Sequence, residues 1–483
     1  AGTSTNASAS RTDNGLVAQS AKANAGASAE AGASASGNAS ATLDFAVGRT
    51  DTSLSLDVTN TGSAIRSGGN LNLDARETID LEGSEIVAEG DIDVNATDIF
   101  AREARDISVR ETSAESVRIG IYADAGGEAE AGAQASAQAG ASANLNSPEA
   151  KASAGADASA KAEAGGKAGV GLQTQVAKLT EKDTEITSQV SAIRSTGGSV
   201  SRTATNSITD VGTEIEAAEN FTQSAQEIRN FAARNESISE RSYEEVTAKV
   251  GVYVEAEGEA AASAGASAKA SKDGASGSVG AQASAEGGAR AGVEVQVDTL
   301  SQTERQRDTQ AVTSSIRVGG NVSSVSEGAS TFEGTTIEAG GDLTVAGEDI
   351  NIVAARDTSE SEFSQTETNS RVAVAVGVGG SAKAGASADT KGNTKSGADA
   401  EGGVKVRAEV STRVATESEN TTETEAVVAN FSAGESLNLT AENDVNIEGA
   451  NLEADEINVD ARELNFTAAE NTSETRSSET EVE

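Results

Sequence analysis

The most regular feature of the chain is a long stretch in which every second residue is small and apolar. In residues 250–270 one parity carries Val, Ala and Gly, whereas the other parity carries most of the Glu and Ser. Strict alternation of this kind is typical of a β-strand with one covered face and one solvated face. The alternation resumes in residues 279–297, after a Gly- and Ser-rich stretch at 271–277 that has the composition of a turn.

The two alternating stretches predict one long β-hairpin. Pairing Ala270 with Val279 places Val254 opposite Val295, so that valines meet at the base of the hairpin and alanines meet towards its tip. About 20 residues per arm, at ~3.3 Å each, give arms of ~65 Å. The same alternation predicts further hairpins at residues 15–47, at 117–176 around a turn at 146–149, and at 372–410 around a turn at 391–393.

Shorter alternating segments lie between the hairpins and carry the larger apolar residues. Leu71 and Ile92 occupy equivalent places about 20 residues apart, as do Leu437 and Ile457. A strand–turn–strand phrase that recurs at this spacing predicts the stacked coils of a parallel β-helix, or β-solenoid, with Leu, Ile, Val and Phe inside. We therefore expect an all-β chain with no helix of more than two turns.

These phrases divide the chain into about four copies of one module. Ile65, Ile193 and Ile316, each followed by Arg, indicate a period near 125 residues. The predicted domains are a partial hairpin repeat at 1–62, repeats at 63–190, 191–313 and 314–428, and a partial repeat of coils at 429–483. The predicted fold is thus a set of β-solenoid coils that alternate with long Ala/Gly-rich antiparallel β-hairpins in an elongated, fibre-like body.

Polar connectors between coils and hairpins allow two interpretations. Residues 358–369 and 417–425 carry Ser, Thr and Glu on both parities. Such a segment is either a disordered linker or a strand solvated on both faces. We favour the strand, because the connectors lie between elements that should pair and because Thr tolerates a solvated sheet.

Composition restricts the partners of such a body. The chain has 483 residues, no Cys, His, Met or Trp, one Pro and a net charge of −41. Large apolar residues are too scarce for a thick globular core. The acidic balance disfavours nucleic acid and anionic membranes as partners. Because no signal peptide and no apolar run of transmembrane length are evident, we expect an internal segment of a longer, processed or secreted polypeptide.

We expect the chain not to be an enzyme, and we assign no catalytic, cofactor-binding or metal-binding residue. Without His or Cys, the usual general base, thiol nucleophile and transition-metal ligands are missing. Glu255, Glu257 and Glu259 alternate with small residues, so we interpret them as part of a solvated face. Such faces bind Ca²⁺ or Mg²⁺ at most loosely, because these cations prefer several converging oxygens.

Two kinds of candidate site follow from residue density alone. The densest groups of oxygen ligands are Asp91, Asp93 and Asn95, and Asp342, Glu348 and Asp349. Asn-x-Ser/Thr sequons include those at Asn95, Asn220, Asn321, Asn438 and Asn465. Ser and Thr are so common here that several sequons are expected by chance, and glycosylation is the less favoured interpretation.

One phrase carries a family resemblance. It consists of Gly340-Gly341-Asp342-Leu343-Thr344-Val345, then Asp349-Ile350-Asn351-Ile352-Val353-Ala354-Ala355-Arg356-Asp357-Thr358, a Ser/Glu-rich run, and the Val-Gly stretch from Val372. In this order it resembles the haemagglutinin repeat of filamentous haemagglutinins and of the stalk proteins of contact-dependent growth inhibition systems. The resemblance covers essentially the whole chain in repeated form.

The resemblance implies a secreted, surface-displayed, β-helical fibre of two-partner secretion that serves adhesion or effector delivery. The chain departs from the family in lacking a secretion domain and a toxin domain, and in its acidic, Ala-rich hairpins, which favours a structural role. Small side chains let two sheets approach closer than the usual ~10 Å, so we expect homopolymerisation through the Ala/Gly faces. Three functions stay open: a structural extracellular filament, the stalk of a toxin-delivery protein, and an adhesin for a receptor on a host or neighbouring cell.

Overall fold

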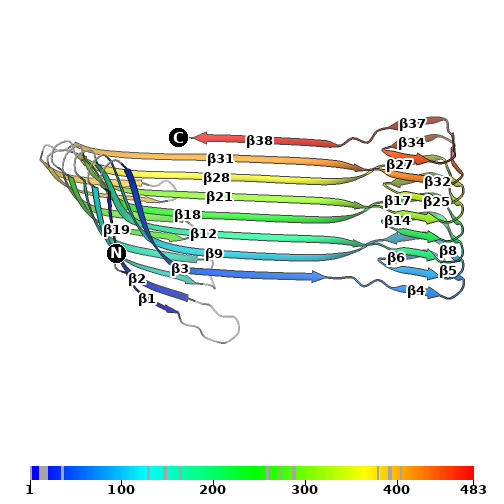
Figure 1. Cartoon of the computed structure of the whole chain (residues 1–483), viewed down its shortest axis with the longest axis horizontal. Coiled ribbons are helices and arrows are strands. Elements are labelled where there is room, and N and C mark those ends of the chain that lie inside the picture. Colours follow the sequence, from blue (N-terminus) through cyan, green and yellow to red (C-terminus); the bar gives the residue numbers. More distant parts are fainter. Residues whose placement is uncertain are drawn as a thin grey trace.

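The computed structural model describes residues 3–9, 20–33, 37–127, 131–144, 149–162, 166–256, 260–271, 274–285, 290–377, 380–389, 394–402 and 405–482. Every regular element in these ranges is a β-strand, and none is a helix, which confirms the predicted all-β class. The strands form four sheets. Figure 1 shows short strands stacked at one end of the molecule, long strands across its middle, and a further sheet at the other end.

Two parallel sheets of short strands form the region that we call the coil stack, and one passage of the chain through it is a coil. The first sheet contains β4 (Ala64–Ser67), β7 (Glu85–Ala88), β13 (Ala192–Ser195), β15 (Glu214–Ala217), β22 (Ser315–Val318), β25 (Thr336–Ala339), β32 (Ala429–Ala433) and β35 (Ala450–Glu453). The second contains β5 (Leu71–Asp74), β6 (Thr78–Glu82), β8 (Ile92–Arg102), β14 (Val200–Val211), β16 (Phe221–Ala225), β17 (Glu227–Phe231), β23 (Val322–Ser326), β24 (Ala329–Glu333), β26 (Leu343–Gly347), β27 (Asp349–Val353), β33 (Ser436–Ala441), β34 (Asp444–Glu448), β36 (Glu456–Asp460) and β37 (Glu463–Thr467).

The register of the coil stack follows the large apolar residues. Leu71 pairs with Ile92 and Leu437 with Ile457, as the 20-residue spacing predicts. Inward residues of inner coils are shielded from solvent, and Phe332 packs edge-to-face on Phe431 of the next module, with ring centroids 5.4 Å apart. The fully buried Ile, Leu and Val side chains of successive coils therefore form one continuous core along the stack.

One antiparallel sheet of long strands, which we call the arm sheet, runs away from the coil stack. Its members are β3 (Gly37–Val58), β9 (Ala104–Gly127), β12 (Gly166–Gln189), β18 (Ala233–Ala256), β21 (Arg290–Val312), β28 (Ala355–Gly377), β31 (Lys405–Val427) and β38 (Thr472–Val482). The polar connectors lie inside β28 and β31, so the strand interpretation is confirmed. Each arm covers the edge of the next, as expected for neighbouring hairpins placed side by side.

A second antiparallel sheet, the tip sheet, contains the Ala-rich ends of the hairpins. Its strands are β1 (Thr3–Ala9), β2 (Ser20–Ala33), β10 (Ala131–Asn144), β11 (Glu149–Ala162), β19 (Ala260–Ser271), β20 (Gly274–Ala285), β29 (Gly380–Asp389) and β30 (Thr394–Gly402). Its register places alanine opposite alanine across seven strands, at Ala31, Ala133, Ala160, Ala262, Ala283, Ala382 and Ala400. The predicted dry contact of these Ala faces concerns side chains that lie outside the described part.

Two details of the predicted hairpins are wrong. Val295 pairs with Val250, and Val254 pairs with Ala291, so the predicted register is displaced by four residues. Strand β19 continues to Ser271 and β20 begins at Gly274, because the small residues assigned to a turn extend the strands instead. A displacement of four keeps every residue on its own face, so the alternation of Ala with polar residues could not detect it.

The predicted hairpin at residues 15–47 is also incorrect. Strand β2 pairs with β1 and β10 in the tip sheet, whereas β3 pairs with β9 in the arm sheet. The two strands that were expected to pair therefore belong to different sheets. The other predicted hairpins are divided in the same way. Each side of such a hairpin consists of one strand in the arm sheet and one strand in the tip sheet.

Coils and arms occur in equal numbers and share one stacking direction. Within the described ranges eight coils face eight arms, because two coils and two arms alternate along the chain. Strands in both kinds of sheet lie ~4.8 Å apart, so seven steps give a stack ~34 Å tall, whereas an arm of about 24 residues extends ~80 Å. The longest dimension therefore follows the arms and is perpendicular to the direction in which modules repeat (Figure 1). The module boundaries themselves stay a prediction.

Candidate functional site

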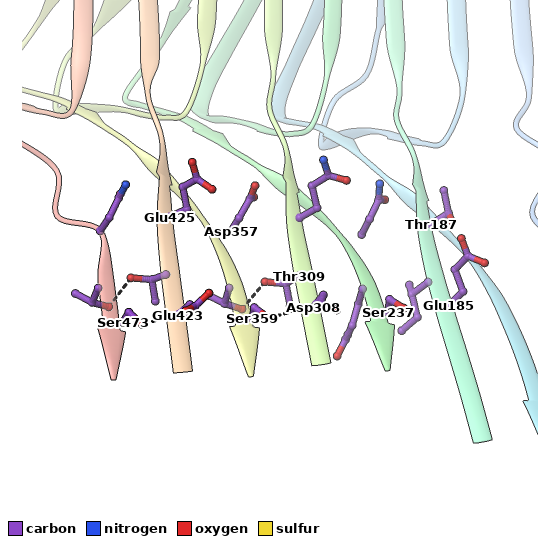
Figure 2. A pocket seen from close by; sticks show the side chains of 18 residues that line it. Glu185, Thr187, Ser237, Asp308, Thr309, Asp357, Ser359, Glu423, Glu425 and Ser473 are labelled. Carbon is purple, nitrogen blue, oxygen red and sulfur yellow. Dashed lines mark hydrogen bonds between the residues drawn. The ribbon is translucent and has the colours of Figure 1, made fainter. Parts of the chain in front are cut away.

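An open polar groove lies where the arm sheet leaves the coil stack. It has a volume of about 760 Å³ and crosses β12, β18, β21, β28, β31 and β38 (Figure 2). Six carboxylates line it, together with Ser, Thr, Asn, Gln and Ile186, and its lining includes no Lys, Arg or aromatic residue. The acidic members are Glu185, Glu236, Asp308, Asp357, Glu423 and Glu425.

One row of the groove alternates acid and hydroxyl from strand to strand. The registers align Asp57, Ser108, Glu185, Ser237, Asp308, Ser359, Glu423 and Ser473 across all eight arms. Ser108 donates a hydrogen bond to Asp57 (2.6 Å), Ser359 to Asp308 (2.6 Å) and Ser473 to Glu423 (3.0 Å). Figure 2 shows the groove part of this acid–hydroxyl row, with Ser473 beside Glu423. Because of this alternation, a strand that carries a hydroxyl group lies between any two carboxylates of the row, which lowers the repulsion between the carboxylates.

A second repeated contact closes the end of the arm sheet. An Asp or Asn at the start of each outgoing arm accepts a hydrogen bond from a backbone N–H of the adjacent returning arm. The acceptors are Asp106, Asn235, Asp357 and Asn471, and the donors are residues 60, 188, 311 and 426, at 2.6–2.8 Å. These side chains satisfy N–H groups where the sheet ladder ends, so their role is structural.

Each outgoing arm packs at its start against a glycine in the left-handed region, which lies in the turn between the two preceding coils. The φ angles of Gly83, Gly212, Gly334 and Gly449 are 52°, 61°, 58° and 60°. A Cβ on Gly334 would lie 2.7 Å from the Cβ of Ala355, the first residue of β28. The other three glycines face Ala104, Ala233 and Ala469 in the same way. Glycine is therefore required twice over here, for its backbone angle and for the close approach of the arm.

Arginines at the same junctions connect one module to the next. Arg234 donates to the backbone carbonyl of Arg356 (3.0 Å), and Arg356 donates to the carbonyl of Glu470 (3.0 Å). Arg234 also pairs with Glu333 at 3.3 Å. Burial raises the pKa of Glu333, and the charge of Arg234 opposes that rise. The Ala-Arg-Asp phrase of the sequence is thus a module-to-module contact.

The Gly-Gly-Asp phrase has a stacking role of the same kind. The Oδ1 of Asn321 accepts a hydrogen bond from the N–H of Asp342 (2.9 Å), whose own Oδ1 accepts from the N–H of Ser436. Six such bonds form a ladder through Asn70, Asp91, Ser199, Asn220, Asn321, Asp342 and Ser436. A Cβ on Gly340 would lie 2.2 Å from the carbonyl oxygen of Gly319, so only glycine permits this spacing.

The structure does not bring the candidate cation ligands together into one site. Asp91 and Asp342 are rungs of the ladder, Asn95 donates to Asp74 (2.9 Å), and Asp349 accepts from the N–H of Asp444. Within the described ranges no three acidic side chains lie close enough together to hold a metal ion. Several sequon asparagines have stacking partners too: Asn220 and Asn321 in the ladder, and Asn438 and Asn465 in side-chain amide pairs with the adjoining coil.

Sequence reasoning missed a polar cluster inside the coil stack. Arg202 is fully buried, forms a two-bond ion pair with Asp210 (2.8 and 2.7 Å), and donates to Gln223 (2.6 Å). Gln223 donates in turn to Ser324 (2.9 Å) of the next module. The side-chain amide of Asn230 is fully buried and finds no hydrogen-bond partner among the described residues. The signal in the sequence was the irregularity of this phrase, where Arg, Asp, Gln and Asn occupy inward positions.

In the groove, Ser359 and Ser473 donate hydrogen bonds to carboxylates, whereas Thr309 pairs with Thr358 and Thr424 with Thr472. The geometry provides stacking contacts that repeat with the module, and a row of hydrogen-bond acceptors open to solvent. No helix long and apolar enough to cross a membrane occurs in the part of the chain that the structure describes.

Comparison with known proteins gives one finding. A family model described as the hemagglutinin repeat matches residues 48–168, 170–299, 295–401 and 392–482. The four matches together cover most of the chain, and their number agrees with the number of modules expected from the period near 125 residues. Searches of curated proteins and of solved structures found no match.

Proposed function

Because the chain belongs to the hemagglutinin repeat family, we propose that it is a structural segment of a secreted or surface-displayed β-rich fibre. In this proposal the coil stack is a β-solenoid, and the arm and tip sheets form a wing along one side of it. The chain acts through its shape and its repetition, and not through catalysis. The lack of His and Cys and the hydrogen-bonded state of the groove hydroxyls support that view.

The observation that carries the proposal is the equal number of coils and arms. Each module adds two coils and two arms, and both pairs advance by ~10 Å along the stacking direction. Modules can therefore be added without strain between the coil stack and the wing. The ladder from Asn70 to Ser436 and the contacts of Arg234 and Arg356 cross module boundaries, so the repeats form one continuous body.

A second candidate, an adhesin, is favoured by the groove. Its row of acids and hydroxyls is open to solvent and extends with every added module, which suits a ligand that makes many weak contacts. The lining holds no aromatic residue, and aromatic residues usually provide the strongest binding contacts. The structural role is therefore the function that we propose first.

A chain with one extra module tests the proposal. A second copy of residues 191–313 would be inserted after residue 313, and small-angle X-ray scattering would measure both chains. The extended chain should grow by ~10 Å along the stacking direction while its length along the arms stays at ~80 Å. An inserted flexible Gly/Ser segment of the same length is the control. Two separate lobes in the extended chain would contradict the proposal.

A further inference from the structure

The polar cluster inside the coil stack occupies positions that are apolar in other coils. Two columns of stacked inward residues in the second parallel sheet change from apolar to polar and back. One column runs through Leu73, Val94, Arg202, Gln223, Ser324, Val345 and Leu439, and the other through Leu81, Ala101, Asp210, Asn230, Phe332, Ile352 and Ile447. After its first member, each column is at most 2% exposed.

One residue of the cluster contacts both neighbouring coils. The Oε1 of Gln223 accepts a hydrogen bond from Arg202 (2.6 Å) in the preceding coil, and its Nε2 donates to Ser324 (2.9 Å) in the first coil of the next module. The ion pair of Arg202 with Asp210 lies within β14, so it does not depend on which coil stacks on that strand. The hydrogen bonds of Gln223, in contrast, depend on the order of the coils.

Stability alone does not explain why these positions are polar. The Nε of Arg202 and both side-chain atoms of Asn230 have no hydrogen-bond partner among the described residues, although both side chains are fully buried. Unpaired buried polar groups destabilise a fold, and a buried ion pair is frequently no better than well-packed apolar residues. In coiled coils a buried polar residue instead fixes register and partner, because a wrong partner leaves it unpaired.

The apolar members of the columns accept several orders of coils. Val94, Val345 and Leu439 occupy the position of Gln223 in other coils, and each suits an apolar neighbour. Leaving out one complete module removes two coils and two arms together, so the coil stack and the arm sheet would both stay continuous. Such misassembly is a characteristic failure of repeat proteins. If the coil of Leu439 stacked directly on the coil of Gln223, the amide of Gln223 would lose Ser324 and face an apolar side chain.

We infer that Gln223 selects the coil that stacks on it, so that the polar cluster fixes the order in which these modules stack. Arg202 orients the amide for this role: a guanidinium group only donates hydrogen bonds, so it holds Oε1 on its own side and directs Nε2 towards Ser324. This inference goes beyond the proposed function, because a fibre of stacked modules requires apolar contacts between coils but no particular order of them.

Disulfide trapping during refolding tests the inference, since the chain has no Cys of its own. Glu216 and Ser432 lie in one outward column of the first parallel sheet, three strand-to-strand steps apart. This distance of ~14 Å is too long for a disulfide, whereas the two positions would be neighbours at ~4.8 Å if the module between them were left out. A chain with Glu216→Cys and Ser432→Cys would be refolded from urea with a mild oxidant, and non-reducing electrophoresis would measure the intramolecular disulfide.

Adding Gln223→Leu and Ser324→Val to this cysteine pair should raise the disulfide yield about tenfold. The reason is that wrong stacking then no longer leaves a buried amide donor unpaired, while Arg202 keeps its two bonds to Asp210. Val345→Leu is the matched control, because it changes side-chain size in the same column and leaves Gln223 paired. Its yield should equal that of the cysteine pair alone.

A disulfide yield that does not change with Gln223→Leu and Ser324→Val would overturn the inference. So would a yield in the cysteine pair alone that matches Glu216→Cys with Arg317→Cys, two positions that are neighbours in the native stack. Circular dichroism would verify that each variant keeps its β-structure. If the double substitution loses it, Gln223→Met, which keeps the length of the side chain and removes its hydrogen bonds, should give the same rise, and an unchanged yield there would be equally decisive. These outcomes leave the fibre proposal standing.

Discussion

The coil stack and the arm sheet follow the same axis but are stabilised in different ways. In the coil stack each inner rung places Ile, Leu, Val or Phe at full burial, with short parallel strands of four to twelve residues. Near the junction the arm sheet exposes rows of Ser, Thr, Asp and Glu, and its long strands depend on the backbone ladder and on side-chain pairs such as Ser359 with Asp308. Farther along the arms, Val250, Val295 and Val374 are also buried, so the contrast between the two regions applies to the part of the arm sheet near the junction.

The largest expected difference concerns charges in the two regions. Removing Asp210 leaves Arg202 buried without its partner, and we expect Asp210→Ala to lower the free energy of unfolding by ~3–5 kcal/mol. Glu181 pairs with Arg241 at 3.6 Å in the arm sheet, where both side chains are about half exposed. Glu181→Ala should cost less than ~1 kcal/mol. Urea unfolding of both variants provides the measurement, and equal losses would contradict the division of roles.

The junction glycines should show an intermediate effect. Gly334 has a φ of 58° and faces the Cβ of Ala355, so Gly334→Ala should destabilise the chain by ~1–3 kcal/mol. Gly68 lies in the coil stack with open space where an added methyl group would point, which makes Gly68→Ala a matched control. Thermal unfolding followed by circular dichroism would compare the two. A loss for Gly68→Ala as large as that for Gly334→Ala would argue against the steric explanation.

Lowering the pH should change the stability contributions of one carboxyl group in each region in opposite directions. Hydrogen bonds from Ser207 and then Asn206 lower the pKa of Asp98 in the coil stack below its usual 3.8, so its stabilising contribution is present above that value and is lost as the pH falls through the folded pKa. Burial raises the pKa of Asp298 in the arm sheet above 3.8, so its contribution is present below 3.8 and is lost as the pH rises through the folded pKa.

Two substitutions separate these contributions. Ser207→Ala should reduce stability at pH 7 more than at pH 2, because it removes the principal hydrogen bond to the Asp98 carboxylate. Relative to the unmodified chain, Asp298→Asn should raise stability at pH 7 more than at pH 3. The reason is that the unmodified chain buries a charged carboxylate at pH 7, whereas the variant does not. Urea unfolding at the named pH values measures both effects. The opposite roles of Asp98 and Asp298 are contradicted if either variant shows the same change in stability at both pH values.

Salt should give the smallest effect. Self-repulsion from a net charge of −41 opposes the folded state, and 0.1 M salt screens charges beyond ~10 Å. We expect the melting temperature to rise by a few degrees from low salt with chelator to 0.1 M NaCl or added CaCl₂. An unchanged melting temperature across the series would show that the acid–hydroxyl row already removes most of the repulsion.

The sequence predicted the coil stack well and the hairpins less well, for one physical reason. Residues such as Leu437 and Ile457 are large and scarce, so only one alignment of neighbouring coils buries them. The hairpin tips repeat Ala and Gly so uniformly that several alignments of equal parity are equivalent, and the register at Val254 was displaced by four. Side-chain size decided which prediction succeeded.

The polar contacts were harder to predict for another reason. The Gly-Gly-Asp and Ala-Arg-Asp phrases are visible in the sequence, but their partners lie in the adjoining coil or module. Arg202 and Asp210 have the residue types of an exposed strand face, and only the three-dimensional arrangement shows that they point inward and pair with each other. Residue type gives the chemistry of such groups, whereas the register gives their partners.

A pair of distance measurements tests most directly whether coils and arms share one axis and one spacing. Because the chain contains no Cys, spin labels can be placed at Arg66→Cys with Glu453→Cys in the coil stack, and at Asp57→Cys with Ser473→Cys in the arm sheet. Both pairs are separated by seven strand-to-strand steps, so double electron–electron resonance should give ~34 Å for each. Two narrow distributions near that value would support the account. A clearly longer or broad distribution for the arm pair would contradict it, because the wing would then not rise with the stack.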